Sequence, residues 1–270
     1  MKKVSVTLST SFRSFVQARQ LPPAERMQIR RLIDYRESCA PAEVAFPARA
    51  LRDAGTVRWI RDQRLAIDVR TLSELCSAIS AGIHPALITV HDDRLDPDEI
   101  CGVGALGVGR VVLSCIENIA SLGGGISGRT QNVLLRMTDA TPAGSEQRQF
   151  VFDSHEADVA ADAVIGQRSL ILIGLQCEVG AELDDFVSYP AAIGNMIAQM
   201  DQIRRRHDIL LTRLGLGGGS ALAAADSSIV RRDLAEEIDG AVDDACATLR
   251  FPRPSVVISA GAQFVGQRAA

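Results

Sequence analysis

Residues 170–177 read LILIGLQC, a short apolar run with branched side chains that predicts a buried strand. An amphipathic stretch over residues 193–206 follows, and a second apolar run begins at Arg213. The order strand, helix, strand is that of a βαβ unit, which joins two parallel strands. The apolar face of the predicted helix comprises Ile193, Met196, Ile197, Met200 and Ile203.

The same alternation of short apolar runs and longer amphipathic stretches extends from residue 43 to the end of the chain. Eight such repeats in 270 residues predict an α/β fold, the (β/α)8 or TIM barrel. We expect its strands at Val44–Phe46, Ala66–Val69, Leu87–Val90, Arg110–Leu113, Asn132–Arg136, Leu170–Cys177, Arg213–Leu216 and Ser255–Ser259.

The first 40 residues do not follow this alternation. Pro22 and Pro23 open a predicted helix that ends near Glu37. We therefore divide the chain into an N-terminal helical arm, residues 1–40, and a barrel domain, residues 41–270. Two roles stay open for the arm, which either plugs the bottom of the barrel or contacts a partner.

Composition limits the classes of function. The chain has a net charge of −4 and a pI near 5.6, and its arginines are scattered among acidic residues, so we expect no nucleic-acid partner. No apolar run approaches the roughly 20 residues of a membrane span, and no signal peptide is legible, so we expect a cytoplasmic protein without membrane contact. The cysteines lie far apart and no C-x-x-C pair occurs. We expect them to be buried, reduced thiols, and we expect no metal site.

Glycines mark two segments of the chain. Residues 214–220 read LGLGGGS directly after a predicted strand. Loops at this position of a barrel commonly bind phosphate through backbone N–H groups, and a simple tight turn is the alternative. Residues 122–130, which contain Gly123-Gly124-Gly125, and residues 138–148 are predicted to be loops.

Five segments, in the same order along the chain, resemble landmarks of fold type III pyridoxal-phosphate-dependent decarboxylases, the group of diaminopimelate and ornithine decarboxylases. Ile67–Glu74 is similar to the family's L-D-V-x-S-x-x-E segment, and Ala81–His91 to its A-G-x-x-x-x-I-x-F-H stretch. Leu134–Met137 is similar to its L-R-V, Ile173–Gly180 to its G-L-H-C-H-I-G strand, and Leu214–Gly219 to its L-D-L-G-G-G phosphate loop. The resemblance implies a barrel of the alanine racemase type.

The resemblance also implies where a ligand would lie. Pyridoxal phosphate or another phosphate-bearing ligand, held noncovalently, would contact Gly217, Gly218 and Gly219 at the mouth of the barrel. Arg136 and His91 would lie beside it.

The family's lysine, which forms a Schiff base with the cofactor, is replaced here. In Phe46-Pro47-Ala48-Arg49-Ala50 its place is taken by Arg49, and the only lysines of the chain are Lys2 and Lys3. Arginine stays protonated and is no nucleophile. We therefore expect that the barrel cannot form the covalent link to the cofactor.

Other family residues that contact the cofactor are also replaced in this chain. The family's ring-stacking histidine is replaced by Glu178, and a phosphate-binding serine by Ala181. The E-P-G-R element, whose glutamate pairs with the pyridine nitrogen, corresponds in our interpretation to Phe251–Pro254. The family's C-terminal β domain, which contributes to a site shared across a dimer, is expected to be absent from this chain.

These observations favour a degenerate or repurposed relative of the decarboxylases that binds a ligand or a partner, and they favour a role outside decarboxylation. The expected partners are a second copy of the chain, an active decarboxylase homologue or a small phosphorylated ligand. One alternative is an enzyme with other chemistry at the mouth, where Asp68, Glu178 and Arg49 are candidate catalytic groups. Another is residual decarboxylase or racemase activity with noncovalent cofactor.

Several polar residues have a purely structural interpretation as well. Asp68 is predicted either to act at the mouth or to pair with Arg136 as a structural acid. His84, His155 and His207 are interpreted as ordinary turn, loop and helix-end residues, and they form no catalytic triad with a serine and an aspartate.

Overall fold

The computed structural model describes residues 22–139, 149–179, 188–217 and 228–261. Within these ranges eight parallel strands form a closed barrel in the order β4-β3-β2-β1-β9-β8-β7-β5, and pairing of β5 with β4 closes it. The strands are β1 Glu43–Pro47, β2 Ala66–Val69, β3 Ile88–His91, β4 Arg110–Leu113, β5 Gln131–Thr138, β7 Leu170–Glu178, β8 Arg213–Gly217 and β9 Ser255–Ser259. The predicted TIM barrel is confirmed, with strand ends shifted by one or two residues at most. A short extra strand, β6 Phe150–Val151, pairs with the end of β5.

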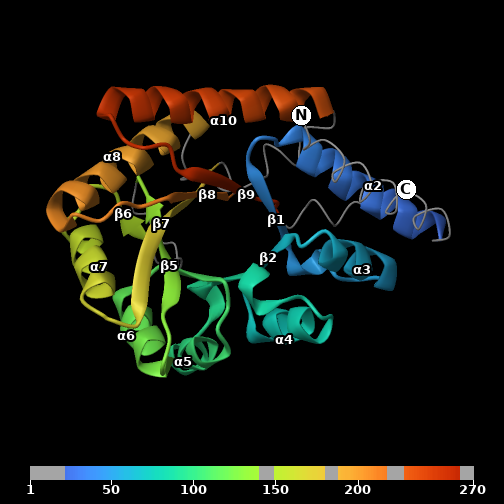
Figure 1. Ribbon diagram of the computed structural model, residues 1–270, viewed down its shortest axis with the longest axis horizontal. Coiled ribbons are helices and arrows are strands. Elements are labelled where there is room, and N and C mark those ends of the chain that lie inside the picture. Colours follow the sequence, from blue (N-terminus) through green and yellow to red (C-terminus); the bar gives the residue numbers. More distant parts are fainter. Residues whose placement is uncertain (1–21, 140–148, 180–187, 218–227, 262–270) are drawn as a thin grey trace, which may run out of the picture.

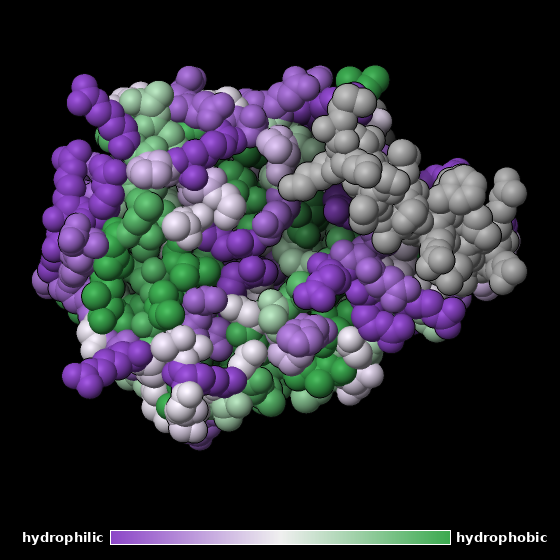
Figure 2. Space-filling view, in the orientation of Figure 1, coloured by the Kyte–Doolittle hydropathy of each residue, from purple (hydrophilic) through white to green (hydrophobic). Residues whose placement is uncertain are grey.

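Helices surround the barrel in sequence order, as Figure 1 shows. They are α2 Pro23–Ser38, α3 Ala54–Asp62, α4 Leu72–Ser80, α5 Pro97–Leu106, α6 Ile116–Gly125, α7 His155–Ile165, α8 Tyr189–His207 and α10 Ser228–Leu249. Short 3-10 turns follow β1 and β3, namely η1 Ala48–Ala50 and η3 Asp92–Arg94, and a third, η2 Pro85–Leu87, precedes β3. Figure 2 shows hydrophilic residues over most of the rim that the helices form.

Local sequence explains where several helices begin. Asp53 accepts a hydrogen bond from Thr56 N at the start of α3, and Thr71 accepts one from Glu74 N at the start of α4. Asp96 and Glu99 form a complete capping box at the start of α5. These caps satisfy backbone donors that have no partner inside the helix.

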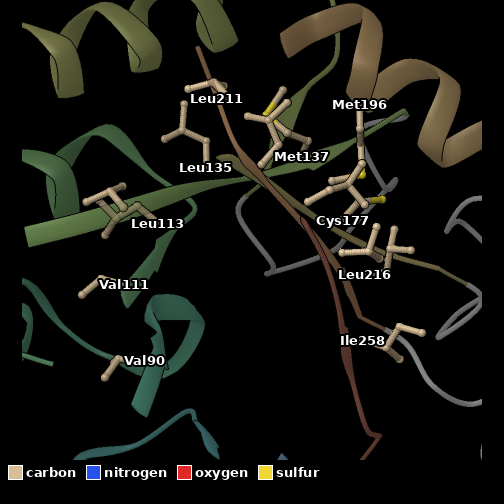
Figure 3. Close-up of a cluster of buried hydrophobic side chains, with 14 of the residues drawn as sticks. Val90, Val111, Leu113, Leu135, Met137, Cys177, Met196, Leu211, Leu216 and Ile258 are labelled. Carbon is tan, nitrogen blue, oxygen red and sulfur yellow. The ribbon is translucent and has the colours of Figure 1, made fainter. Parts of the chain in front are cut away.

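The hydrophobic core lies between the barrel and the helices. Strand residues that point outward, such as Val111 and Leu135, are fully buried there. Figure 3 shows Met196 of α8 reaching toward Cys177 of β7 in this layer. The predicted apolar face of α8 is confirmed, because all five of its named residues are buried.

The segment around the first glycine triplet differs from the prediction of a loop. α6 continues through Gly123, Gly124 and Gly125. A side chain on Gly125 would collide with the backbone of Cys101 in α5, so glycine permits close contact of the two helices. Packing has therefore overridden the low helix propensity of glycine. The predicted loop 138–148 falls mostly outside the described residues, and Thr138 belongs to β5.

The predicted helix of the N-terminal arm is confirmed as α2, which packs against α10 and α3 in the outer layer (Figure 1). Ile29, Leu32 and Tyr35 of α2 are buried. Residues 1–21, the remainder of the predicted arm, lie outside the described residues. In the described parts of the chain no helix combines the length and the low charge that a membrane span requires.

The six cysteines all lie among the described residues and form no disulfide, but the prediction that they are buried is wrong for two of them. Cys76 in α4 and Cys101 in α5 are exposed, because each lies on the outward side of its helix.

Candidate functional site

Four charged side chains form a closed ring at the C-terminal end of the barrel. Arg70 directly follows β2, and Asp93 lies in η3 after β3. Arg136 is in β5, and Glu178 ends β7. Because the carboxyl ends of barrel strands meet at one mouth, residues from four different strand ends come together there.

The ring alternates in charge. Arg70 Nη1 lies 2.7 Å from Asp93 Oδ2, and Arg70 Nη2 lies 2.9 Å from Glu178 Oε1. Arg136 Nη2 lies 3.0 Å from Glu178 Oε1, and Arg136 Nη1 lies 3.4 Å from Asp93 Oδ1. The Arg136 side chain is only 2% exposed, whereas that of Arg70 is 33% exposed, so the ring is open to solvent on the Arg70 side.

Neighbouring residues hold the ring in place. The buried Asp92 carboxylate accepts hydrogen bonds from Ser114 N, Ser114 Oγ and Asn118 Nδ2, which fixes η3 and with it Asp93. Gln176 Nε2 donates to Glu178 Oε1 at 3.2 Å. These contacts restrict the side chains before any ligand arrives.

The ring keeps its carboxylates ionised. Burial alone would raise the pKa of Glu178, but Arg136 and Arg70 hold it below the usual value. Burial likewise opposes ionisation of Asp93, and Arg70 and Arg136 hold the pKa of that carboxyl low. Burial would lower the pKa of Arg70, but Glu178 and Asp93 raise it. Both carboxylates are therefore charged at neutral pH and are poor proton donors there.

Asp68 and His91 form a second polar group at the same end of the barrel. His91 Nε2 lies 3.7 Å from Asp68 Oδ2, and both side chains are buried. Burial acts to raise the pKa of Asp68, but His91, Ser259 and Arg70 lower it overall. The predicted pairing of Asp68 with Arg136 is wrong, since Arg136 contacts Glu178 and Asp93. The placement of His91 at the end of its strand is correct.

Arg49, the third catalytic candidate, is separate from this cluster. It lies in η1 after β1 and is exposed. In the described part of the chain it forms no ion pair with Asp68 or Glu178. The predicted grouping of these three charges is therefore corrected: the arginines beside Glu178 are Arg70 and Arg136.

The glycine loop can be followed only at its first residue. Gly217 ends β8 beside β7, and its partner in the ladder is Glu178. A β-carbon added at Gly217 would lie 2.5 Å from Glu178 Cδ, so the carboxylate of Glu178 takes the space above this glycine. Gly218 and Gly219, predicted as phosphate contacts, and Ala181 lie outside the described residues.

The segment interpreted as the E-P-G-R element lies elsewhere. Phe251–Pro254 precedes β9, at the N-terminal end of the barrel. Arg253 forms ion pairs with Asp239 and Asp243 of α10. This interpretation is therefore wrong, because the segment connects a helix to the start of a strand and cannot reach the mouth.

His84 and His207 occupy the expected turn and helix-end positions, whereas His155, predicted in a loop, begins a helix. His84 accepts a hydrogen bond from Ala86 N before η2, His155 begins α7, and His207 ends α8 beside Asp162. Among the described residues no group of three or more potential metal ligands gathers at one place.

The sequence interpretation missed Arg70 and Asp93. Both directly follow predicted strands, Arg70 after Val69 and Asp93 after His91 and Asp92. Charged residues just beyond the end of a barrel strand point to the shared mouth, and this rule could have identified both.

The sequence is similar to a known family and to several curated proteins. Residues 26–266 match the family described as "Pyridoxal-dependent decarboxylase, pyridoxal binding domain". A diaminopimelate decarboxylase of Actinosynnema pretiosum subsp. auranticum is 29% identical over 245 residues, which cover 86% of this chain and 55% of that protein. A diaminopimelate decarboxylase of Corynebacterium efficiens is 25% identical over 257 residues, which cover 86% of this chain and 56% of that protein.

Solved structures agree on the fold. The diaminopimelate decarboxylase of M. jannaschii superposes with a TM-score of 0.73 at 15% identity, covering 89% of this chain and 60% of that one. An arginine decarboxylase of Paramecium bursaria Chlorella virus gives a TM-score of 0.69 at 15% identity, covering 89% and 63%. The chain thus spans little more than half the length of the curated relatives that it matches.

Proposed function

The chain belongs to the pyridoxal-dependent decarboxylase family through the pyridoxal-binding domain, and from this premise we propose that it is a repurposed member that binds a ligand or partner without forming the covalent cofactor link. One observation carries the proposal. The described barrel contains no lysine, because the only lysines of the chain are Lys2 and Lys3. Arginine cannot replace lysine in Schiff-base formation.

The residues at the mouth do not fit pyridoxal phosphate in the usual covalent manner. Arg49 stands at the position that the sequence comparison assigns to the lysine, and it is exposed on η1. The ionised carboxylate of Glu178 lies against Gly217 and repels a phosphate at that glycine. Arg70 and Arg136 are already paired with carboxylates of this chain. We therefore derive no reaction step through this cofactor.

The alternative of acid–base catalysis by Asp68 and Glu178 has less support. A general acid or base works best when its pKa lies near the operating pH. The pKa of each of these carboxyls is held below its usual value. Both groups are suited to holding a positive charge in place, and neither is suited to moving a proton at neutral pH.

The test is a decarboxylation assay on the full chain. Purified protein is incubated with pyridoxal phosphate and diaminopimelate, the compound named in its relatives, and released carbon dioxide is measured beside an active diaminopimelate decarboxylase. We expect no release above the protein-free background. Turnover that disappears in Asp68→Asn or Glu178→Gln would contradict the proposal and would favour residual activity with noncovalent cofactor.

The proposal includes a protein partner. The proposed partner is a full-length decarboxylase homologue or a second copy of the chain, and the basis is the similarity of the chain to diaminopimelate decarboxylases. We place this assembly in the cytoplasm. Co-expression with a full-length diaminopimelate decarboxylase, followed by size-exclusion chromatography with light scattering, should give a complex or a dimer. A monomer that elutes apart from the homologue contradicts the partner version.

A further inference from the structure

We propose that the interior of the barrel binds a small carboxylate at its N-terminal end, between Arg110 and Arg213. Both arginines are the first residues of their strands, β4 and β8, and both line one interior cavity. The site lies at the opposite end of these strands from the charged ring. Its existence does not depend on the function proposed above.

The cavity follows from small and polar residues at inward positions of the strands. Barrel interiors are commonly filled by bulky branched side chains. Here Thr89, Gly215 and Ser259 take three of the inward positions and leave a small pocket that is partly open to solvent. The lining residues are Asp68, Thr89, His91, Arg110, Val112, Leu134, Gln176, Arg213, Gly215, Val257 and Ser259.

Both arginines line this space, and among the described residues Arg213 has a carboxylate within ion-pair distance whereas Arg110 has none. Arg110 Nε donates to Thr89 Oγ1 at 3.1 Å, and no carboxylate of the described residues lies within ion-pair distance of Arg110. Arg213 pairs with Glu43, whose side chain is 57% exposed at the rim. Burial, followed by the charge of Arg213, lowers the pKa of Arg110. An anion between the two guanidinium groups would relieve both effects.

Buried polar atoms without partners point to the same space. Gln176 Oε1 and both ring nitrogens of His91 have no hydrogen-bond partner among the described residues, and both side chains are almost completely buried. Such atoms are normally satisfied by water or by a ligand. The Asp68 carboxylate also lines the cavity, beside His91 and Ser259, and its charge partly offsets the effect of burial on the pKa of Arg110.

These groups define the chemistry of the ligand. A carboxylate suits paired guanidinium groups, which offer several N–H donors in a plane. A hydroxyl or amino group on the adjacent carbon would reach toward Gln176 or His91. The limited space restricts the ligand to short-chain acids, and acetate and glycolate are suitable probes.

The experiment is calorimetric titration of the full chain with sodium acetate and sodium glycolate, at ionic strength held constant with sodium chloride. Loss of one charged hydrogen-bond donor should weaken binding about tenfold or more in Arg110→Gln. Arg206→Gln is the matched control, because Arg206 pairs with Asp158 and Asp162 on the surface. It should bind both acids as the wild type does.

A second variant keeps the test valid if Arg110→Gln fails to fold. Gly215→Ala leaves both arginines in place, and its new methyl group would lie 3.1 Å from Gln176 Cγ, at the wall of the cavity. It should weaken acetate binding while the circular dichroism spectrum stays unchanged. The proposal is overturned if the wild type binds carboxylates no better than chloride, or if wild type, Arg110→Gln and Gly215→Ala bind equally.

Discussion

The carboxylate of Glu178 lies against Gly217, in the space that a side chain on this residue would need. The two residues are partners across β7 and β8. The same carboxylate is held by Arg70 and Arg136 at 2.9 and 3.0 Å. The chain therefore supplies its own anion at the end of β8, where the sequence comparison places a phosphate loop.

Removing the charge of Glu178 should make the mouth attract anions. In Glu178→Gln, Arg70 and Arg136 keep only Asp93 as a charged partner. We expect inorganic phosphate to bind about tenfold more tightly than to the wild type, measured by calorimetry. Glu74→Gln is the control, because it removes the same charge from a carboxylate that accepts a hydrogen bond from the backbone N–H of Arg70 and, among the described residues, forms no ion pair with Arg70 or Arg136. Equal phosphate affinity in the two variants would show that Glu178 does not occupy an anion site.

Arg136 should be important for stability. Its side chain is buried and pairs with two carboxylates, so Arg136→Met leaves Asp93 and Glu178 with a single cation. We expect a loss of about 3 to 5 kcal/mol in the free energy of unfolding by urea. In Arg206→Met, where an exposed surface pair is lost, the expected loss is about 0 to 1 kcal/mol. Similar losses in the two variants would contradict the buried ring.

Stability should fall in acid. The pKa values of Asp68, Asp93 and Glu178 lie below their usual 3.8, 3.8 and 4.5 in the folded protein. The contribution of these three ionised carboxyls to the free energy of unfolding is therefore fully present above their usual pKa values, which apply to the unfolded chain. It is lost as the pH falls through their lower pKa values in the folded protein. Asp92 acts in the opposite direction, because burial raises its pKa and its contribution is lost as the pH rises.

Urea unfolding between neutral pH and about pH 3 measures this dependence. The net loss toward acid should be smaller in Glu178→Gln, which lacks one of the three carboxyls with a lowered pKa. A wild type whose unfolding free energy rises steadily toward acid would rule out this electrostatic role.

Adjacent glycines in α6 should respond oppositely to alanine. A β-carbon on Gly124 has no atom within 4 Å, so Gly124→Ala should stabilise the helix by up to about 1 kcal/mol. A β-carbon on Gly125 would lie 2.8 Å from the carbonyl carbon of Cys101, so Gly125→Ala should lower the melting temperature. The melting temperatures of both variants, measured by calorimetry, separate the effect of packing from that of helix propensity. If both melting temperatures shift in the same direction, the close contact of α5 and α6 is contradicted.

Much of the fold could be predicted from the sequence, because each barrel strand is a short apolar run between amphipathic helices. The run at residues 170–177 and the helix around Met196 are clear examples. The end of α6 could not be predicted, since Gly125 is explained by its contact with Cys101 of α5, which lies on the other side of β4 in the sequence. Local propensity carries no information about such a neighbour.

The site was predictable only in part. The positions of Asp68, His91, Arg136 and Glu178 follow from inward-facing places near the ends of strands. Their pairing does not, because the choice of Glu178 over Asp68 as the partner of Arg136 depends on the three-dimensional placement of β2, β5 and β7. The exposure of Arg49 on η1 likewise depends on how the chain turns after β1.

The most direct test of the central claim is chemical labelling. The full chain is incubated with pyridoxal phosphate, reduced with borohydride, digested and mapped by mass spectrometry, beside a variant with Lys2→Arg and Lys3→Arg. We predict that no reduced adduct forms within residues 22–261 of either protein, and that any label on the wild type lies on the N-terminal peptide. An adduct on a peptide of the barrel, above all one containing Arg49, would contradict the account.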